Sequence, residues 1–201
     1  MRAKRIGIFS GTFDPVHEGH VSFAKEALKH EKLDKVFFLV EPRPRRKQGV
    51  RALEHRIRMV ELALAKEPKL GLIILEQARF DVAKTLPLLE ARLPGAQLYM
   101  LMGEDGLGHL AHWPQIEQLT PKVHFVVGIR QHDATEVKRR IKVVETVRGV
   151  KVHYSTFRPS HNEYSSSTIR LQLKRGYKAV GLSSKVLSYI TAQGLYAPSA
   201  E

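Results

Sequence analysis

Residues 6–20 read Ile6-Gly7-Ile8-Phe9-Ser10-Gly11-Thr12-Phe13-Asp14-Pro15-Val16-His17-Glu18-Gly19-His20. The apolar residues at the start predict a buried strand, and the small, turn-forming residues that follow predict a loop opening a helix near Val16. The N-terminus of a helix offers unpaired N–H groups and the positive end of a dipole, which favour phosphate. His17 and His20 are three positions apart and therefore share one face of that helix. The segment predicts a phosphate-binding site.

A second segment near the other end of the chain has a related pattern, Tyr164-Ser165-Ser166-Ser167-Thr168-Ile169-Arg170. Serine is a preferred residue at a helix N-terminus, and its hydroxyl and the free amides there can also meet phosphate. Arg170 follows about one helical turn later, and its planar guanidinium suits phosphate oxygens. Alone, this pattern is typical of an ordinary capped helix, but together with the first segment it predicts a second phosphate contact.

Composition limits the class of protein. The chain has 201 residues, of which 43% are hydrophobic and 26% charged, so we expect a single globular domain over residues 1–201. It contains no cysteine, which excludes disulfides and thiolate ligands. No signal peptide or membrane-spanning segment is evident, so we expect a cytoplasmic protein without a membrane partner. The net charge of +13 suits anionic ligands, yet no common nucleic-acid-binding motif is present.

Strand and helix patterns alternate along the chain. The expected strands after the first are residues 36–40, 72–75, 97–102, 123–127 and 150–154. The expected helices between and after them are residues 53–66, 82–92, 134–148, 165–174 and 183–193, with short helices before residue 119. Strands separated by helices predict an α/β fold with a doubly wound parallel sheet, and residues 163–201 form a small C-terminal helical part. Ligands of such sheets bind beyond the carboxyl ends of the strands, where the first segment lies.

Residues 11–20 match the G-T-F-D-P-x-H-x-G-H signature of the nucleotidyltransferases, and residues 164–170 resemble their I-S-S-T-x-I-R element. Further stretches resemble the bacterial nicotinate-nucleotide adenylyltransferase family, among them Met102-Gly103-Glu104-Asp105, a strand ending at Arg130, and Gly194-Leu195-Tyr196. The resemblance implies a Rossmann-like nucleotidyltransferase fold and adenylyl transfer from ATP to nicotinate mononucleotide in NAD biosynthesis. It implies catalytic roles for His17, His20 and Arg170, and contacts with ATP from Gly11, Thr12, Phe13, Gly19, Ser166, Ser167, Gly103 and Asp105.

The same resemblance implies an acceptor site made by Arg46, Lys47, Arg56, Asp81 and Trp113. Without it, Trp113 would be interpreted as a core anchor. Two departures bear on the acceptor. Phe80-Asp81-Val82 stands where the family usually has S-Y-T, and Pro114 removes a backbone donor after Trp113. An acid at position 81 repels a carboxylate, so nicotinamide mononucleotide or another phosphomonoester is also a candidate acceptor.

Two alternatives stay open. One is a related adenylyl- or cytidylyltransferase that acts on another phosphomonoester. The other is a catalytically inactive basic protein with an RNA-binding or regulatory function. Mg²⁺ is expected with ATP, and no metal site built from protein ligands is expected, because Mg²⁺ keeps most of its waters. Asp14 could orient the loop, contact the outer shell of that metal or cap the helix. Small molecules are the expected partners, nucleic acid is not, and homo-oligomerisation is left open.

Overall fold

The computed structural model describes residues 2–43, 49–74, 80–131, 133–161 and 163–197 of the chain. Within these residues lies one sheet of six strands in the order β3-β2-β1-β4-β5-β6, with every neighbouring pair parallel. The strands are β1 (Arg5–Gly11), β2 (Lys35–Val40), β3 (Leu70–Ile74), β4 (Gln97–Gly103), β5 (Val123–Gly128) and β6 (Tyr154–Phe157). The strand order and direction confirm the expected α/β fold with a parallel sheet.

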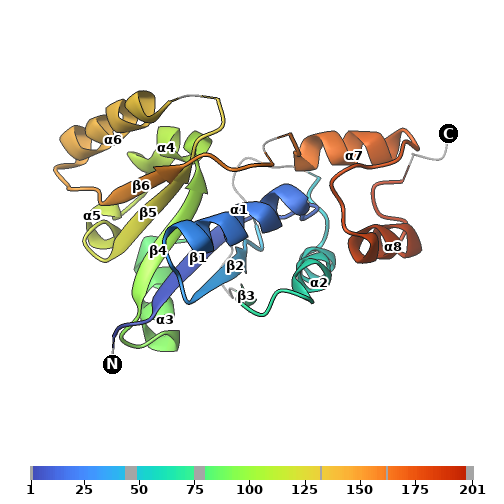
Figure 1. Cartoon of the computed structure of the whole chain (residues 1–201), viewed down its shortest axis with the longest axis horizontal. Coiled ribbons are helices and arrows are strands. Elements are labelled where there is room, and N and C mark those ends of the chain that lie inside the picture. The colour runs from blue at the N-terminus through green and yellow to red at the C-terminus, as the bar shows by residue number, and fades with distance from the viewer. Residues whose placement is uncertain (1, 44–48, 75–79, 132, 162, 198–201) are drawn as a thin grey trace.

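Helices cover both faces of this sheet (Figure 1). They are α1 (Glu18–His30), α2 (Leu53–Leu64), α3 (Val82–Arg92), α4 (Glu104–Leu110), α5 (Ile116–Leu119), α6 (Ala134–Arg148), α7 (Ser166–Lys174) and α8 (Ser184–Ala192). The buried residues of α3, α4, α5 and α6 share one apolar core with the sheet, and those of α1, α2 and α8 share the other. The sheet is therefore doubly wound.

Neighbouring strand residues supply the two cores alternately, as the pleat of a strand requires. Leu39 of β2 and Met100 of β4 belong to the core under α3 to α6, whereas their neighbours Phe38 and Leu101 belong to the core under α1, α2 and α8. Because both faces are buried, these strands consist almost entirely of apolar residues, which is typical of parallel sheets.

The centre of the sheet contains the point at which the strand order reverses. β1 and β4 lie side by side, but the helix after β1 packs on one face and the helix after β4 packs on the other. The loops at their carboxyl ends therefore diverge, which is where doubly wound sheets bind their ligands. The turn Thr12–His17 and the start of α4 both lie at this edge.

The last strand is displaced from its expected position. The sequence pattern predicts residues 150–154, whereas β6 spans Tyr154–Phe157. Gly149 ends α6 in the left-handed conformation (φ +64°), and the amides of Val150 and Val152 then bond to Glu145 of the same helix. Because the amides of these residues bond to the end of α6, the pairing with β5 begins at Tyr154 instead of at residue 150.

Other boundaries differ by less. α1 starts at Glu18 with His17 as its N-cap, whereas the sequence predicts a start near Val16. β3 begins at Leu70, two residues before the expected start, and α2 ends at Leu64. The expected C-terminal helical part is present as α7 and α8, which lie beside the sheet (Figure 1). Over the ranges that the structure describes, no helix is both long and apolar enough to cross a membrane.

Candidate active site

The loop after β1 is compact because an aromatic side chain folds beneath it. Phe13 has a left-handed backbone (φ +50°) and is buried, and its ring packs edge-on against His20 at a centroid distance of 5.1 Å. A Cβ on Gly11 would lie 2.9 Å from the Phe13 ring, so only glycine fits there without a shift. Gly19 is similarly constrained, because a Cβ there would lie 3.0 Å from Nδ1 of His17.

His17 and His20 meet at the first turn of α1. Their ring centroids are 3.7 Å apart, and the backbone N–H of His17 donates to Nδ1 of His20 at 3.2 Å. Because Nδ1 of His20 accepts this bond, the ring proton of His20 lies on Nε2, which is then a donor. Burial and the positive charge of Arg130 lower the pKa of His17 to about 4, so His17 is uncharged at neutral pH. The pair places an uncharged His17 and the Nε2 donor of His20 beside a helix N-terminus.

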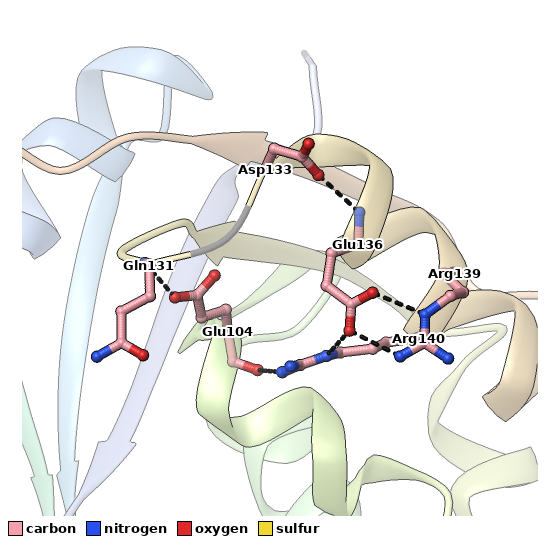
Figure 2. A network of polar contacts seen from close by, with 6 residues as sticks. All are labelled: Glu104, Gln131, Asp133, Glu136, Arg139 and Arg140. Atoms are coloured by element: carbon pink, nitrogen blue, oxygen red, sulfur yellow. Dashed lines mark hydrogen bonds and ion pairs between the residues drawn. The ribbon is translucent and has the colours of Figure 1, made fainter.

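Arg130, which follows β5, lies at the site, although the sequence pattern assigned it no role there. Its charge acts on His17, and its backbone is held by Glu104, a buried residue at the start of α4. One carboxylate oxygen of Glu104 accepts from the amide of Arg130 at 3.1 Å and from that of Gln131 at 2.5 Å. Figure 2 shows this carboxylate beside the turn and the carbonyl of Glu104 bonded to Arg140 of α6. A strand that ends in arginine is the sequence signal for this residue.

α7 joins the loop from the C-terminal part of the chain. Ser165 caps α7 by accepting from the amide of Thr168 at 3.1 Å, as the serine cluster predicts. Nη1 of Arg170 donates to the carbonyl of Asp14 at 2.7 Å, and the Ser166 hydroxyl donates to the carbonyl of Pro15 at 3.0 Å. The two sequence segments, more than 140 positions apart, are therefore in direct contact at the edge of the sheet.

Arg56 has a different position from the one expected of an acceptor-binding residue. It is 1% exposed, and its guanidinium donates to the carbonyls of Arg51, Thr12, Glu41 and Pro42 at 2.8 to 2.9 Å. Four of the five N–H donors of this guanidinium thus meet backbone carbonyls inside the fold. Arg56 therefore holds three loops of the site together, and its direct contact with the acceptor stays a prediction.

The end of β4 contributes open space. A Cβ on Gly103 would meet no heavy atom of the described residues within 4 Å, and its φ of −75° suits any residue. Neither packing among the described residues nor backbone conformation therefore demands glycine at this position. Asp105 lies exposed in the first turn of α4 beside it.

Two of the expected acceptor residues are Asp81, which caps α3, and Trp113, which follows α4 and packs on Phe80, the neighbour of Asp81. The rings of Phe80 and Trp113 have centroids 5.6 Å apart, and Trp113 is half-buried against the core. Asp81 is the N-cap of α3: it accepts from the amide of Lys84 at 3.2 Å, while its own amide donates to the Thr85 hydroxyl at 3.0 Å. Asp81 therefore has a structural function in addition to any effect on a ligand. Arg46 and Lys47 lie outside the described residues.

Comparison with known proteins agrees with this geometry. The cytidylyltransferase-like family profile matches residues 8–172. The "Probable nicotinate-nucleotide adenylyltransferase" of Gloeobacter violaceus is 34% identical over 202 residues, covering 96% of both chains. The chain belongs to the nicotinate-nucleotide adenylyltransferase family. The Bacillus subtilis nicotinate-nucleotide adenylyltransferase is 35% identical over 136 residues, which cover 64% of this chain and 70% of that protein.

A solved structure of a nicotinate-nucleotide adenylyltransferase-like protein shares the fold. The Plasmodium falciparum nicotinic acid mononucleotide adenylyltransferase complexed with NaAD superposes with a TM-score of 0.77, at 18% identity, over 96% of this chain and 97% of that one. The family resemblance and the Rossmann-like fold inferred from the sequence are therefore confirmed, and the chain is a nucleotidyltransferase of the nicotinate-nucleotide adenylyltransferase family.

Proposed function

We propose that this chain transfers the adenylyl group of ATP to the 5′-phosphate of nicotinate mononucleotide, giving the dinucleotide and pyrophosphate in NAD biosynthesis. The observation that carries the proposal is the meeting of two helix N-termini at one loop. α1 brings the adjacent rings of His17 and His20, and α7 brings Arg170, which is bonded to the carbonyl of Asp14. Membership of the family supports ATP and a pyridine mononucleotide as the substrates.

In this proposal one group of site residues contacts the phosphates of ATP, and another contacts its ribose. His20 donates from Nε2, and Arg170 donates from its guanidinium, to phosphate oxygens that gain charge as the bond to pyrophosphate breaks. The triphosphate lies along the loop and the α7 N-terminus, where Gly11, Thr12, Phe13, Gly19, Ser166 and Ser167 shape its path. The ribose of the nucleotide lies against Gly103 and Asp105, above the open end of β4.

The chemistry needs positioning more than proton transfer. An oxygen of the acceptor's phosphate attacks the α-phosphorus of ATP, and the bond to the β-phosphate oxygen breaks. A phosphomonoester has a second pKa of about 6, so the attacking oxygen is already anionic at neutral pH and no general base is required. Rate enhancement then comes from alignment and from donors aimed at the developing charge, as in phosphoryl transfer generally.

Mg²⁺ is part of the proposal as a companion of ATP. When bound, it neutralises phosphate charge and keeps several water ligands. The residues fit that arrangement, because the carboxylate oxygens of Asp14 accept from Tyr196 and Arg51 and an oxygen of Glu104 accepts from two amides. Substrate phosphates and water would therefore supply most of the coordination. Asp14 acts through these contacts to orient the loop.

The acid form of the mononucleotide is the first candidate acceptor and the amide form is the second. A specific feature supports the second: Asp81 places a negative charge next to Phe80, which packs on Trp113, and Pro114 has no N–H to donate. A carboxylate with a missing donor is penalised by about 1–3 kcal/mol, so discrimination against the amide should fall by one to two orders of magnitude.

The decisive experiment is a pyrophosphate-release assay with purified protein, ATP, Mg²⁺ and a panel of acceptors. We expect the highest kcat/KM with nicotinate mononucleotide and a measurable value with nicotinamide mononucleotide, and CTP should not replace ATP. Activity with another phosphomonoester alone, or with CTP, would favour the related transferases. RNA binding without turnover of ATP would favour an inactive regulatory protein. We also propose that the protein is located in the cytoplasm. Its oligomeric state can be measured by analytical sedimentation.

A further inference from the structure

Tyr196, 182 positions along the chain from Asp14, reaches back into the loop that follows β1. Its hydroxyl donates to Oδ1 of Asp14, and both side chains are buried with 4% of their surface exposed. Tyr196 follows α8, and this contact plays no part in the hydrogen bonds that end that helix. The bond links the first loop of the site to the segment that follows the last helix.

The end of α8 places the tyrosine. Gly194 turns the chain in the left-handed conformation (φ +58°), and the amide of Leu195 bonds to the carbonyl of Ile190 at 3.0 Å, which closes the helix end. Leu195 and Tyr196 then enter the same apolar core as Phe13 and the inner face of α1. The position of the ring is therefore set by packing, and the hydroxyl is held at the loop.

Further contacts complete the enclosure of Asp14. The Arg51 amide donates to Oδ2 of Asp14 at 3.4 Å, and the Arg51 guanidinium lies 5.0 Å from the centre of the Tyr196 ring. Arg170 binds the Asp14 carbonyl at 2.7 Å. Burial and the contact with Asp14 raise the pKa of Tyr196, so its hydroxyl keeps its proton and remains a donor. Two side chains and one backbone amide, from three separate segments, thus converge on one loop residue.

We propose that Tyr196 is a positioning residue for adenylyl transfer, acting through Asp14 to hold the loop 11–16 and Arg170 in register with the triphosphate. This inference rests on the function proposed above. Without the hydroxyl, a buried carboxylate oxygen loses its donor and the loop can shift. Because a displacement of about 1 Å costs about 10²-fold in rate, we expect the effect in kcat rather than in acceptor binding.

The test is Tyr196→Phe, with Tyr189→Phe as the matched control. Tyr189, on α8, makes an equivalent single bond to Nδ1 of His55 at 2.8 Å but does not contact the loop. We expect Tyr196→Phe to lower kcat about 10- to 10²-fold while KM for the mononucleotide changes less than about threefold. Tyr189→Phe should keep kcat within about twofold, although it also loses one hydrogen bond. Equal kcat values for the two variants would overturn the proposal.

Two further measurements separate positioning from folding. Asp14→Ala removes the acceptor and leaves the tyrosine; it should lower kcat as Tyr196→Phe does, and the double variant should lose less than about twofold more. Multiplying effects in the double variant would show independent roles and contradict the proposal. Amide hydrogen exchange of residues 11–16 should rise in Tyr196→Phe and not in Tyr189→Phe. Hydrogen exchange needs no turnover, so it tests the contact between Tyr196 and the loop independently of activity. If the wild-type protein failed to adenylate pyridine nucleotides, that result would reject the proposed function but not this contact.

Discussion

On the phosphate side of the site, side chains from distant parts of the chain bond to the loop after β1, whereas on the acceptor side Asp81 bonds to residues of its own helix turn. Arg56, Arg170 and Tyr196 reach the loop from 44, 156 and 182 positions away. Lys84 and Thr85, which bond to Asp81, lie three and four positions away from it. The position of the phosphate-binding loop therefore depends on the whole fold, whereas the position of Asp81 on the acceptor side depends largely on a local helix cap.

This difference predicts two kinds of mutational effect. Substitutions on the phosphate side should change the rate for every acceptor, because they move groups aimed at the reacting phosphates. Substitutions at Asp81 should change which acceptor is preferred while leaving the chemistry with ATP intact. The expected outcomes below run from the largest effect to the smallest.

His20→Ala should lower kcat about 10²- to 10³-fold with either acceptor, because it removes a donor from the place where transition-state charge develops. Steady-state kinetics with saturating ATP measure it. His30→Ala, at the opposite end of α1 and exposed, is the control and should keep its activity. A His20→Ala enzyme with wild-type kcat would remove the histidine pair from the chemistry and abolish the contrast between the two sides.

Arg170→Lys should lower kcat/KM for ATP about 10- to 10²-fold. A lysine cannot span two oxygens as the guanidinium does, and the loss of a charge-assisted bond costs about 1.5–3 kcal/mol. Arg139→Lys, an exposed arginine of α6 paired with Glu136, serves as the control. If Arg170→Lys has unaltered kinetics with ATP, Arg170 supports the fold of the loop but does not bind the phosphates of ATP.

His17 should make stability depend on pH. Its pKa is about 4 in the folded chain and 6.5 when unperturbed, so the unfolded state binds more protons between those values. The contribution of neutral His17 is complete above about pH 6.5, declines as the pH falls toward 4, and is constant below that. Urea unfolding should show that the stability advantage of wild type over His17→Gln shrinks by about 2 kcal/mol from pH 7 to pH 5. A constant difference would mean that His17 is not buried in its neutral form.

Asp81→Asn should raise the preference for nicotinate over nicotinamide mononucleotide about fivefold, since removing one nearby charge near a protein surface is worth about 1 kcal/mol. Asparagine caps helices as well as aspartate does, so stability should hold. Asp133→Asn, the same exchange at the N-cap of α6, is the control. The ratio of the two kcat/KM values is the measurement. A general loss of activity, larger than that of Arg170→Lys, would show that the acceptor side is as tightly coupled as the phosphate side.

The sequence by itself determined the elements whose rules are local. The apolar run and turn of residues 6–20, the histidines on one helix turn, and the serine cap at Ser165 follow from spacing and capping chemistry, and the structure contains each of them. The alternation of strands and helices was also sufficient for the doubly wound sheet. These features depend on residues within about one helical turn or strand of each other.

Only the tertiary structure decided what depends on burial and on distant partners. The sequence did not indicate that Arg56 would be buried against four backbone carbonyls, or that Tyr196 would reach back to Asp14. The late start of β6 depends on amides that bond to the end of α6. In each case a polar group inside the fold must find a hydrogen-bond partner, and packing, rather than sequence spacing, determines which partner is within reach.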